Sequence, residues 1–240
     1  MNNFKFDLND ENILNVYQYG SRVYQSHTEN SDYDYIIVVK EHFDSKDIDY
    51  HIYTEESFKM AIYEHDISAL ECLFLKNEFI LKNTIDFKSE FKLNKEKLRT
   101  SISIIVNNSY VKCKKKLIVA GDYDLNCGIK SFFHSFRILN YGVQIALKGY
   151  IYDYACCNWL LNELRTLSKQ YQRNELWDII ETRYKEMHKK KKSAFKELCP
   201  KNNNKLNIQI LNQWLKNNNL SIMDEKQYNK FLSEIINKYF

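Results

Sequence analysis

The part of the chain from Leu93 onward has the residue spacing of helices and contains no convincing strand. Its apolar residues recur at positions i, i+3, i+4 and i+7, which is the pattern of amphipathic helices. The chain has a single proline, Pro200, which with the asparagine run at 202–204 marks a break between helices. Helices are expected at about 94–118, 123–148, 154–170, 171–197, 205–217 and 224–238.

The residues before Leu93 differ, because short β-prone runs alternate there with helical spacing. Strands are expected at 16–19, 33–39, 47–54 and 79–81, and a helix at 55–75. Strands and helices followed by helices alone predict an α+β fold. We expect two domains, an α/β head over residues 1–92 and an all-α tail over residues 93–240.

Composition excludes several classes of protein. Apolar residues make up 44% of the chain and charged residues 28%, so a packed core is expected rather than disorder. No apolar stretch approaches the roughly 20 residues that span a bilayer, and the first residues lack the layout of a signal peptide. The six cysteines contain no C-x-x-C pair, which argues against structural zinc and indicates the reduced thiols of a cytoplasmic protein.

The segment with the most chemical content runs from Gly20-Ser21, through ten residues, to Asp32-Tyr33-Asp34. Side chains two apart on a strand share one face, so the two aspartates are expected to point the same way. Carboxylates are ligands that Mg²⁺ prefers, and two divalent ions can clamp the reacting oxygens of phosphoryl transfer. Gly20 lets the backbone approach a phosphate, and Ser21 adds a hydroxyl and an N–H donor. The motif therefore predicts a phosphoryl-transfer site that uses Mg²⁺ or Mn²⁺.

A third carboxylate is expected on the following strand, where Asp47, Asp49 and His51 alternate onto one face. Asp49 is the favoured metal ligand, and Asp47 is the alternative. Either side chain could reach the metals if this strand pairs antiparallel with the strand that carries Asp34.

Three basic residues follow on a predicted helix. Lys130, His134 and Arg137 occupy positions i, i+4 and i+7, so they lie on one helical face. Three basic side chains on one stripe favour an anionic partner, and an NTP triphosphate facing the carboxylates would serve. The alternative interpretation is an ordinary solvated helix face.

These motifs resemble the DNA polymerase beta-like nucleotidyltransferase superfamily, whose signature is G-S, ten residues and D-x-D. The segments GSRVYQSHTENSDYDYIIVV, DYHIYTEESF and ALECLF look like a branch of predicted bacterial and viral nucleotidyltransferases associated with RNA repair. That family carries a Lys, a His and an Arg on one helix after a Tyr-Asp element, as at Tyr123-Asp124 followed by Lys130, His134 and Arg137. Its loop after G-S usually carries a second Gly, and this chain has Gln25 there.

The resemblance implies a mixed-sheet nucleotidyltransferase head and a helical domain that binds substrate. It implies transfer of a nucleoside monophosphate from an NTP to an acceptor hydroxyl. RNA is the expected acceptor, favoured by basic clusters at 112–116 and 188–192, and a protein or a small molecule is the alternative. A non-catalytic nucleotide-binding regulator is the third possibility. The residues implied are Asp32, Asp34 and Asp49 for the metals and catalysis, and Gly20, Ser21, Lys130, His134 and Arg137 for the nucleotide.

Overall fold

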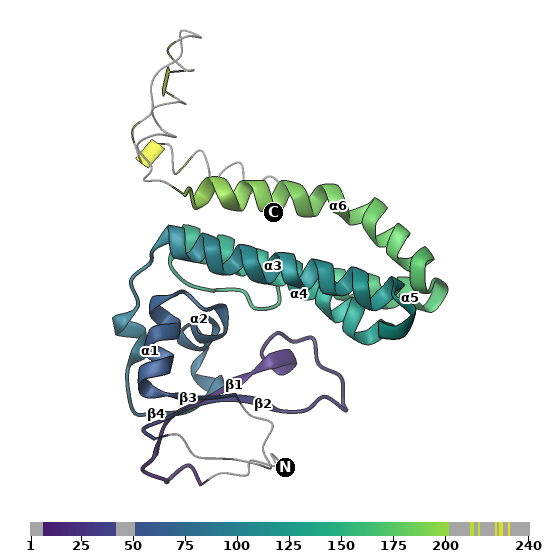
Figure 1. The fold of residues 1–240 in the computed structure, drawn as a ribbon. Coiled ribbons are helices and arrows are strands. Elements are labelled where there is room, and N and C mark those ends of the chain that lie inside the picture. Colours follow the sequence, from purple (N-terminus) through teal and green to yellow (C-terminus); the bar gives the residue numbers. More distant parts are fainter. Residues whose placement is uncertain are drawn as a thin grey trace.

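A computed structural model describes residues 7–41 and 51–201, together with 212, 213, 216, 224, 226, 227 and 230. These residues form a sheet of four strands, followed by long helices (Figure 1). The strands are β1 (Ile13–Tyr19), β2 (Asp34–Val39), β3 (His51–Thr54) and β4 (Ile80–Asn83). The helices are α1 (Glu55–Tyr63), α2 (Ile67–Leu73), α3 (Lys95–Ile118), α4 (Leu125–Lys148), α5 (Asn158–Gln170) and α6 (Arg173–Leu198). This arrangement confirms the expected α+β class.

The strand order is β3-β2-β1-β4, and both faces of the sheet are covered by apolar side chains. Strand β1 runs antiparallel to β2 and β4, whereas β2 and β3 are parallel, with Ile36 beside His51. The antiparallel pairing under which either Asp47 or Asp49 could reach the metals is therefore not the pairing found. The alternation of side chains could not reveal this, because it is the same in a parallel and an antiparallel strand. Asp47 and Asp49, which precede β3, lie outside the described residues.

The helix expected at 55–75 is divided into α1 and α2. His65 lies between them with a left-handed φ of 61°. Asp66 then begins the second helix, because its side chain accepts a hydrogen bond from the backbone N–H of Ser68 at 2.8 Å. A new N-cap inside an apolar helical pattern thus ends one helix and starts the next.

The helical part is built around α4, which contacts α3, α5 and α6. Helices α3 and α4 form an antiparallel hairpin, and Gly128 is needed for their close approach: a Cβ there would lie 2.8 Å from Leu117. Asn94 and Asp124 cap the two N-termini, and Gly149 ends α4 with a φ of 84°. Helices α3 to α6 match the four expected between 94 and 197, whereas most residues of the last two expected helices lie outside the described ranges.

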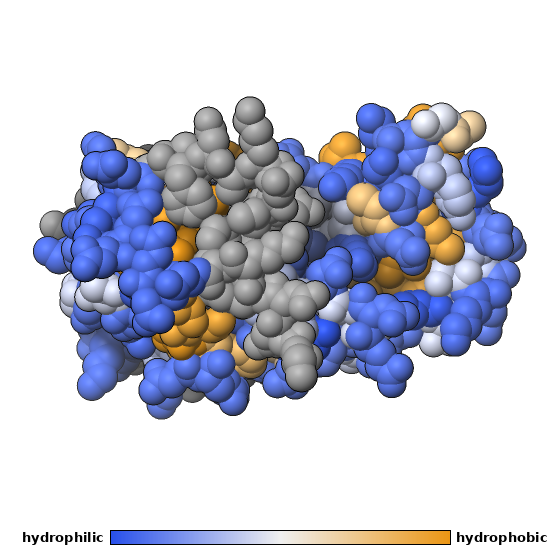
Figure 2. Space-filling model, turned by 90° about the horizontal axis from the view of Figure 1, so that it is seen from below, coloured by the Kyte–Doolittle hydropathy of each residue, from blue (hydrophilic) through white to orange (hydrophobic). Residues whose placement is uncertain are grey.

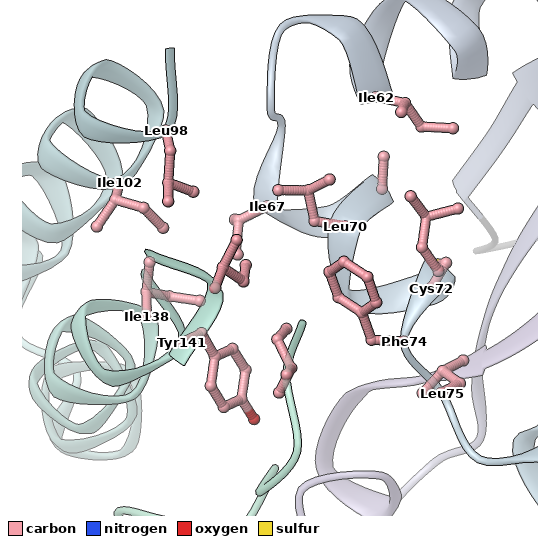
Figure 3. Close-up of a cluster of buried hydrophobic side chains, with 14 of the residues drawn as sticks. Ile62, Ile67, Leu70, Cys72, Phe74, Leu75, Leu98, Ile102, Ile138 and Tyr141 are labelled. Carbon is pink, nitrogen blue, oxygen red and sulfur yellow. The ribbon is translucent and has the colours of Figure 1, made fainter. Parts of the chain in front are cut away.

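One hydrophobic cluster joins the sheet region to the helices. In Figure 3, Leu70 of α2 lies in the same cluster as Leu98 and Ile102 of α3 and Tyr141 of α4, and all four side chains are fully buried. In Figure 1 the sheet, the pair α1 and α2, the pair α3 and α4, and α6 follow one another as layers. The change in sequence pattern near residue 93 therefore marks a change in secondary structure, while the largest core spans both sides of it.

The described residues in view on the sheet side are mostly hydrophilic, with apolar residues among them in separate groups (Figure 2). Within the described ranges, no helix is both long and apolar enough to cross a membrane.

Candidate functional site

A cavity of about 630 Å³ lies between the β1–β2 connection and helices α4 and α5. Its lining brings together six of the residues that the sequence singled out, which are Ser21, Asp32, Asp34, Lys130, His134 and Arg137. More than 90 residues of sequence separate the acidic group from the basic group, so only the tertiary structure places them around one space.

Gly20 lies directly under one of the carboxylates. The β1–β2 register pairs Tyr19 with Asp34, and the next residue, Gly20, has a left-handed φ of 80°. A Cβ at Gly20 would lie 2.0 Å from Oδ2 of Asp34, which is far inside van der Waals contact. Both the backbone conformation and the space therefore require glycine, and its absent side chain is what allows the Asp34 carboxylate to sit against the turn.

The two aspartates are both exposed and both line the cavity, but only Asp34 belongs to the strand. Asp32 precedes β2, so the expectation that a shared strand aligns the pair is wrong. Arg22 holds this stretch instead: its guanidinium donates to the backbone oxygens of Ser31 (2.7 Å) and Asp32 (3.4 Å), and it lies 3.8 Å from the Tyr33 ring centroid. The loop conformation, rather than strand alternation, thus places Asp32 in the lining of the same cavity as Asp34.

The basic residues of α4 differ in exposure. Lys130 is exposed, His134 is half-buried, and Arg137 is only 3% exposed. The interpretation as a solvated helix face therefore fits Lys130 alone. Lys130 keeps its charge accessible to the cavity, whereas the charge of Arg137 is enclosed by protein.

Arg137 is held by partners from the sheet region. Its NH1 lies 3.4 Å from Oε2 of Glu71 on α2, and its guanidinium carbon lies 3.4 Å from the ring centroid of Tyr24. Its NH2 donates to Nδ1 of His134 at 2.7 Å. Burial works against the charge of Arg137, but Tyr24 and Glu71 raise its pKa well above the ordinary value. The arginine that the sequence assigned to a phosphate thus forms a buried ion pair in the cavity wall.

Two residues of α5 that the sequence did not predict also belong to the site. Asn158 donates to the backbone oxygens of Tyr24 (2.9 Å) and Gln25 (3.1 Å), and Arg165 donates to that of Ser26 (3.2 Å). Arg165 also lines the cavity and adds a second positive charge to that of Lys130. The sequence carried no signal for these contacts, because they join the loop to a helix more than 130 residues away.

The carboxylate pair fits one kind of metal site. The described part of the chain contains no group of three His, Cys, Asp or Glu residues that could hold a metal ion. Mg²⁺, however, commonly binds one or two protein carboxylates and completes its shell with substrate phosphates and water. Asp32 and Asp34 therefore suit a divalent ion that arrives with a triphosphate. The expected third ligand, Asp49, and its alternative, Asp47, lie outside the described residues.

Compared with known proteins, the chain matches no family model, no curated protein and no solved structure. The fold and the site together define an α+β protein with a cavity that is lined by two exposed carboxylates of the β1–β2 connection and by basic side chains of α4 and α5.

Gln25 provides a test of the loop conformation. It has a left-handed φ of 57°, a conformation that glycine adopts more readily than other residues. A left-handed conformation costs a non-glycine residue roughly 1–2 kcal/mol. Replacing Gln25 with Gly removes that cost, and the greater backbone entropy that glycine loses on folding offsets about half of the stability gained. We expect Gln25→Gly to raise the free energy of unfolding by about 0.5–1 kcal/mol in urea denaturation.

The matched control is Gln18→Gly in the extended strand β1, which is expected to lower the free energy of unfolding by about 1 kcal/mol. Equal losses at both positions would contradict the assignment of backbone strain to Gln25.

Proposed function

We propose that this protein is a metal-dependent nucleotidyltransferase that moves a nucleoside monophosphate from an NTP to an acceptor hydroxyl. The observation that carries the proposal is the cavity, where exposed Asp32 and Asp34 share one space with Lys130 and Arg165. Carboxylates suit the metal, and cations suit the phosphates that the metal bridges. A non-catalytic regulator would not require two exposed carboxylates beside a turn that excludes every side chain at Gly20.

The acidic and the basic side chains of the cavity have separate roles in the proposed reaction. Asp32 and Asp34 would hold Mg²⁺ or Mn²⁺, which when bound supplies Lewis-acid stabilisation of the charge that develops on the α-phosphate. Lys130 and Arg165 would bind the triphosphate and orient its leaving pyrophosphate. Ser21 would add a hydroxyl donor beside the Gly20 turn.

The base of the nucleotide has apolar contacts available in the same cavity. Phe133 of α4 and Leu161 of α5 both line it and are otherwise buried. An aromatic face can stack on any of the four bases, so this wall supports base binding without selecting a particular NTP.

Asp49 belongs to the proposal through its place in the sequence. Asp49 lies two residues before His51, and Asp34 lies two residues before Ile36. Ile36 and His51 are partners in the parallel pairing of β2 with β3. We propose that Asp49 binds the catalytic metal and helps to deprotonate the acceptor hydroxyl, with Asp47 as the alternative.

RNA is the proposed acceptor, and the basic clusters give it partial support. Lys112 and Lys114 are exposed on α3. In the run 188–192, however, His188 and Lys191 are buried, so that run is not a continuous basic surface. Lys115 and Lys116 both pair with Asp122, at 3.2 Å and 2.6 Å. This reduced exposed charge is the observation that favours the second candidate, transfer to a protein or a small molecule.

The test is incubation of the purified protein with each of the four labelled NTPs, Mg²⁺ or Mn²⁺, and total RNA. We expect label on RNA, dependent on metal and lost with excess EDTA, with binding that weakens steeply as salt rises. Label on protein would redirect the proposal to the second acceptor class. The background is the double variant Asp32→Asn/Asp34→Asn, and the matched surface control is Asp178→Asn on α6. Wild type no better than the double variant with every NTP would overturn the proposal.

A further inference from the structure

The hydrogen bond between Arg137 and His134 fixes the chemistry of the histidine. Arg137 NH2 lies 2.7 Å from Nδ1 of His134. A guanidinium has five N–H donors and no acceptor, so Nδ1 must accept this hydrogen bond. A neutral imidazole that accepts at Nδ1 carries its single hydrogen on Nε2. The contact is therefore compatible with only one of the three forms that a histidine can take.

Arg137 cannot turn away from this contact without large cost. Its other side is bound to Glu71, whose side chain is 1% exposed, and its planar group lies against the ring of Tyr24. Leaving Glu71 without its partner would leave an uncompensated charge in the protein interior. The ion pair thus acts as a fixed support that reaches from α2 to the histidine on α4.

The surroundings of His134 also keep it neutral. Burial, followed by the charges of Arg137 and of Lys112 on α3, lowers its pKa to about 3. Among the groups around the cavity, Lys130 and Arg165 add positive charge, whereas Asp32 and Asp34 are the acids. Nε2 makes no hydrogen bond to the described residues. It is also not one of the fully buried polar atoms without a partner, so it is accessible to solvent. The Nε2–H group is therefore available to the cavity.

We propose that Arg137 is a positioning residue that holds His134 as the neutral Nε2–H tautomer, so that His134 donates a hydrogen bond to an anionic group bound in the cavity. The anion would be a phosphate of the NTP, a point that rests on the proposed function, whereas the tautomer itself does not. His134 then cannot accept the proton of the acceptor hydroxyl, because its only lone pair is bound to Arg137. The proton must pass to a carboxylate or to solvent instead.

Long-range ¹H–¹⁵N spectra of the histidine-labelled wild-type protein test the tautomer directly. The His134 signal is assigned by its absence in His134→Gln. We expect the pattern of the Nε2–H tautomer, unchanged from about pH 5 to pH 8, a range in which a free histidine titrates. An Nδ1–H pattern, or titration of His134 near its ordinary pKa, would overturn the proposal.

Binding of Mg²⁺-triphosphate, measured by calorimetry, tests the donor role. The amide nitrogen of Gln can reach the place of Nε2, whereas that of Asn reaches only the place of Nδ1. We expect His134→Gln to bind within about threefold of wild type and His134→Asn to bind at least about tenfold more weakly. Equal affinities of the two variants would overturn the donor role. An Nε2–H pattern in a wild-type protein that binds no triphosphate would refute the proposed function and the donor role, and leave only the tautomer assignment standing.

Discussion

Replacing Asp34 with Asn is expected to lower the rate of nucleotidyl transfer at least about 10³-fold, since a bound metal contributes several kcal/mol to the transition state. The amide keeps the shape that fits against Gly20 but loses the negative charge that would hold the proposed metal. Asp34 is exposed at the start of β2, so the free energy of unfolding should stay within about 1 kcal/mol of wild type. Single-turnover rates at saturating Mg²⁺, together with urea denaturation, measure both quantities.

The matched control for this variant is Glu29→Gln, which removes an exposed carboxylate from the same β1–β2 connection but is not part of the cavity lining. It should transfer nucleotide at the wild-type rate. If Asp34→Asn kept more than about a tenth of the activity, Asp34 could not be the metal ligand that the mechanism requires.

Replacing Glu71 with Ala is expected to lower the free energy of unfolding by about 3–5 kcal/mol, because it leaves Arg137 as an uncompensated buried charge. Both side chains of this pair are almost fully enclosed, at 1% and 3% exposure. The loss should be measured by urea denaturation with fluorescence and far-UV circular dichroism, to establish that the transition is two-state.

Two comparisons isolate the cause of this loss. The exposed pair Arg183–Glu163, at 3.2 Å, should contribute little, so Glu163→Ala is expected to change stability by less than about 1 kcal/mol. The double variant Glu71→Leu/Arg137→Met removes both charges and should recover much of the loss seen in Glu71→Ala. A Glu71→Ala protein as stable as Glu163→Ala would show that the pair does not support the cavity wall.

The local elements of the fold could be predicted from the sequence because their causes are local. Helices α3 and α4 are set by apolar spacing together with the caps at Asn94 and Asp124, which lie next to the residues they act on. The division between α1 and α2 was missed, although Asp66 carried the signal for it. The apolar spacing continues unchanged through this N-cap, so the spacing alone does not show where one helix ends and the next begins.

The site could be predicted only in part. Gly20-Ser21, Asp32 and Asp34 were identified because a tight turn and a carboxylate pair leave a short-range pattern. The basic stripe of α4 was also visible, but its spacing could not separate exposed Lys130 from Arg137, which is buried against Glu71. Periodicity reports which residues share a face and carries no information on what that face meets.

By itself, then, the sequence determined the order and type of the elements, the carboxylate pair and the basic stripe, all of which depend on neighbours within a few residues. Only the tertiary structure decided the parallel pairing of β3, the hold of Asn158 and Arg165 on the β1–β2 connection, and the ion pair behind His134. These features depend on which distant surfaces pack together, and that choice is made by the burial of the whole apolar core.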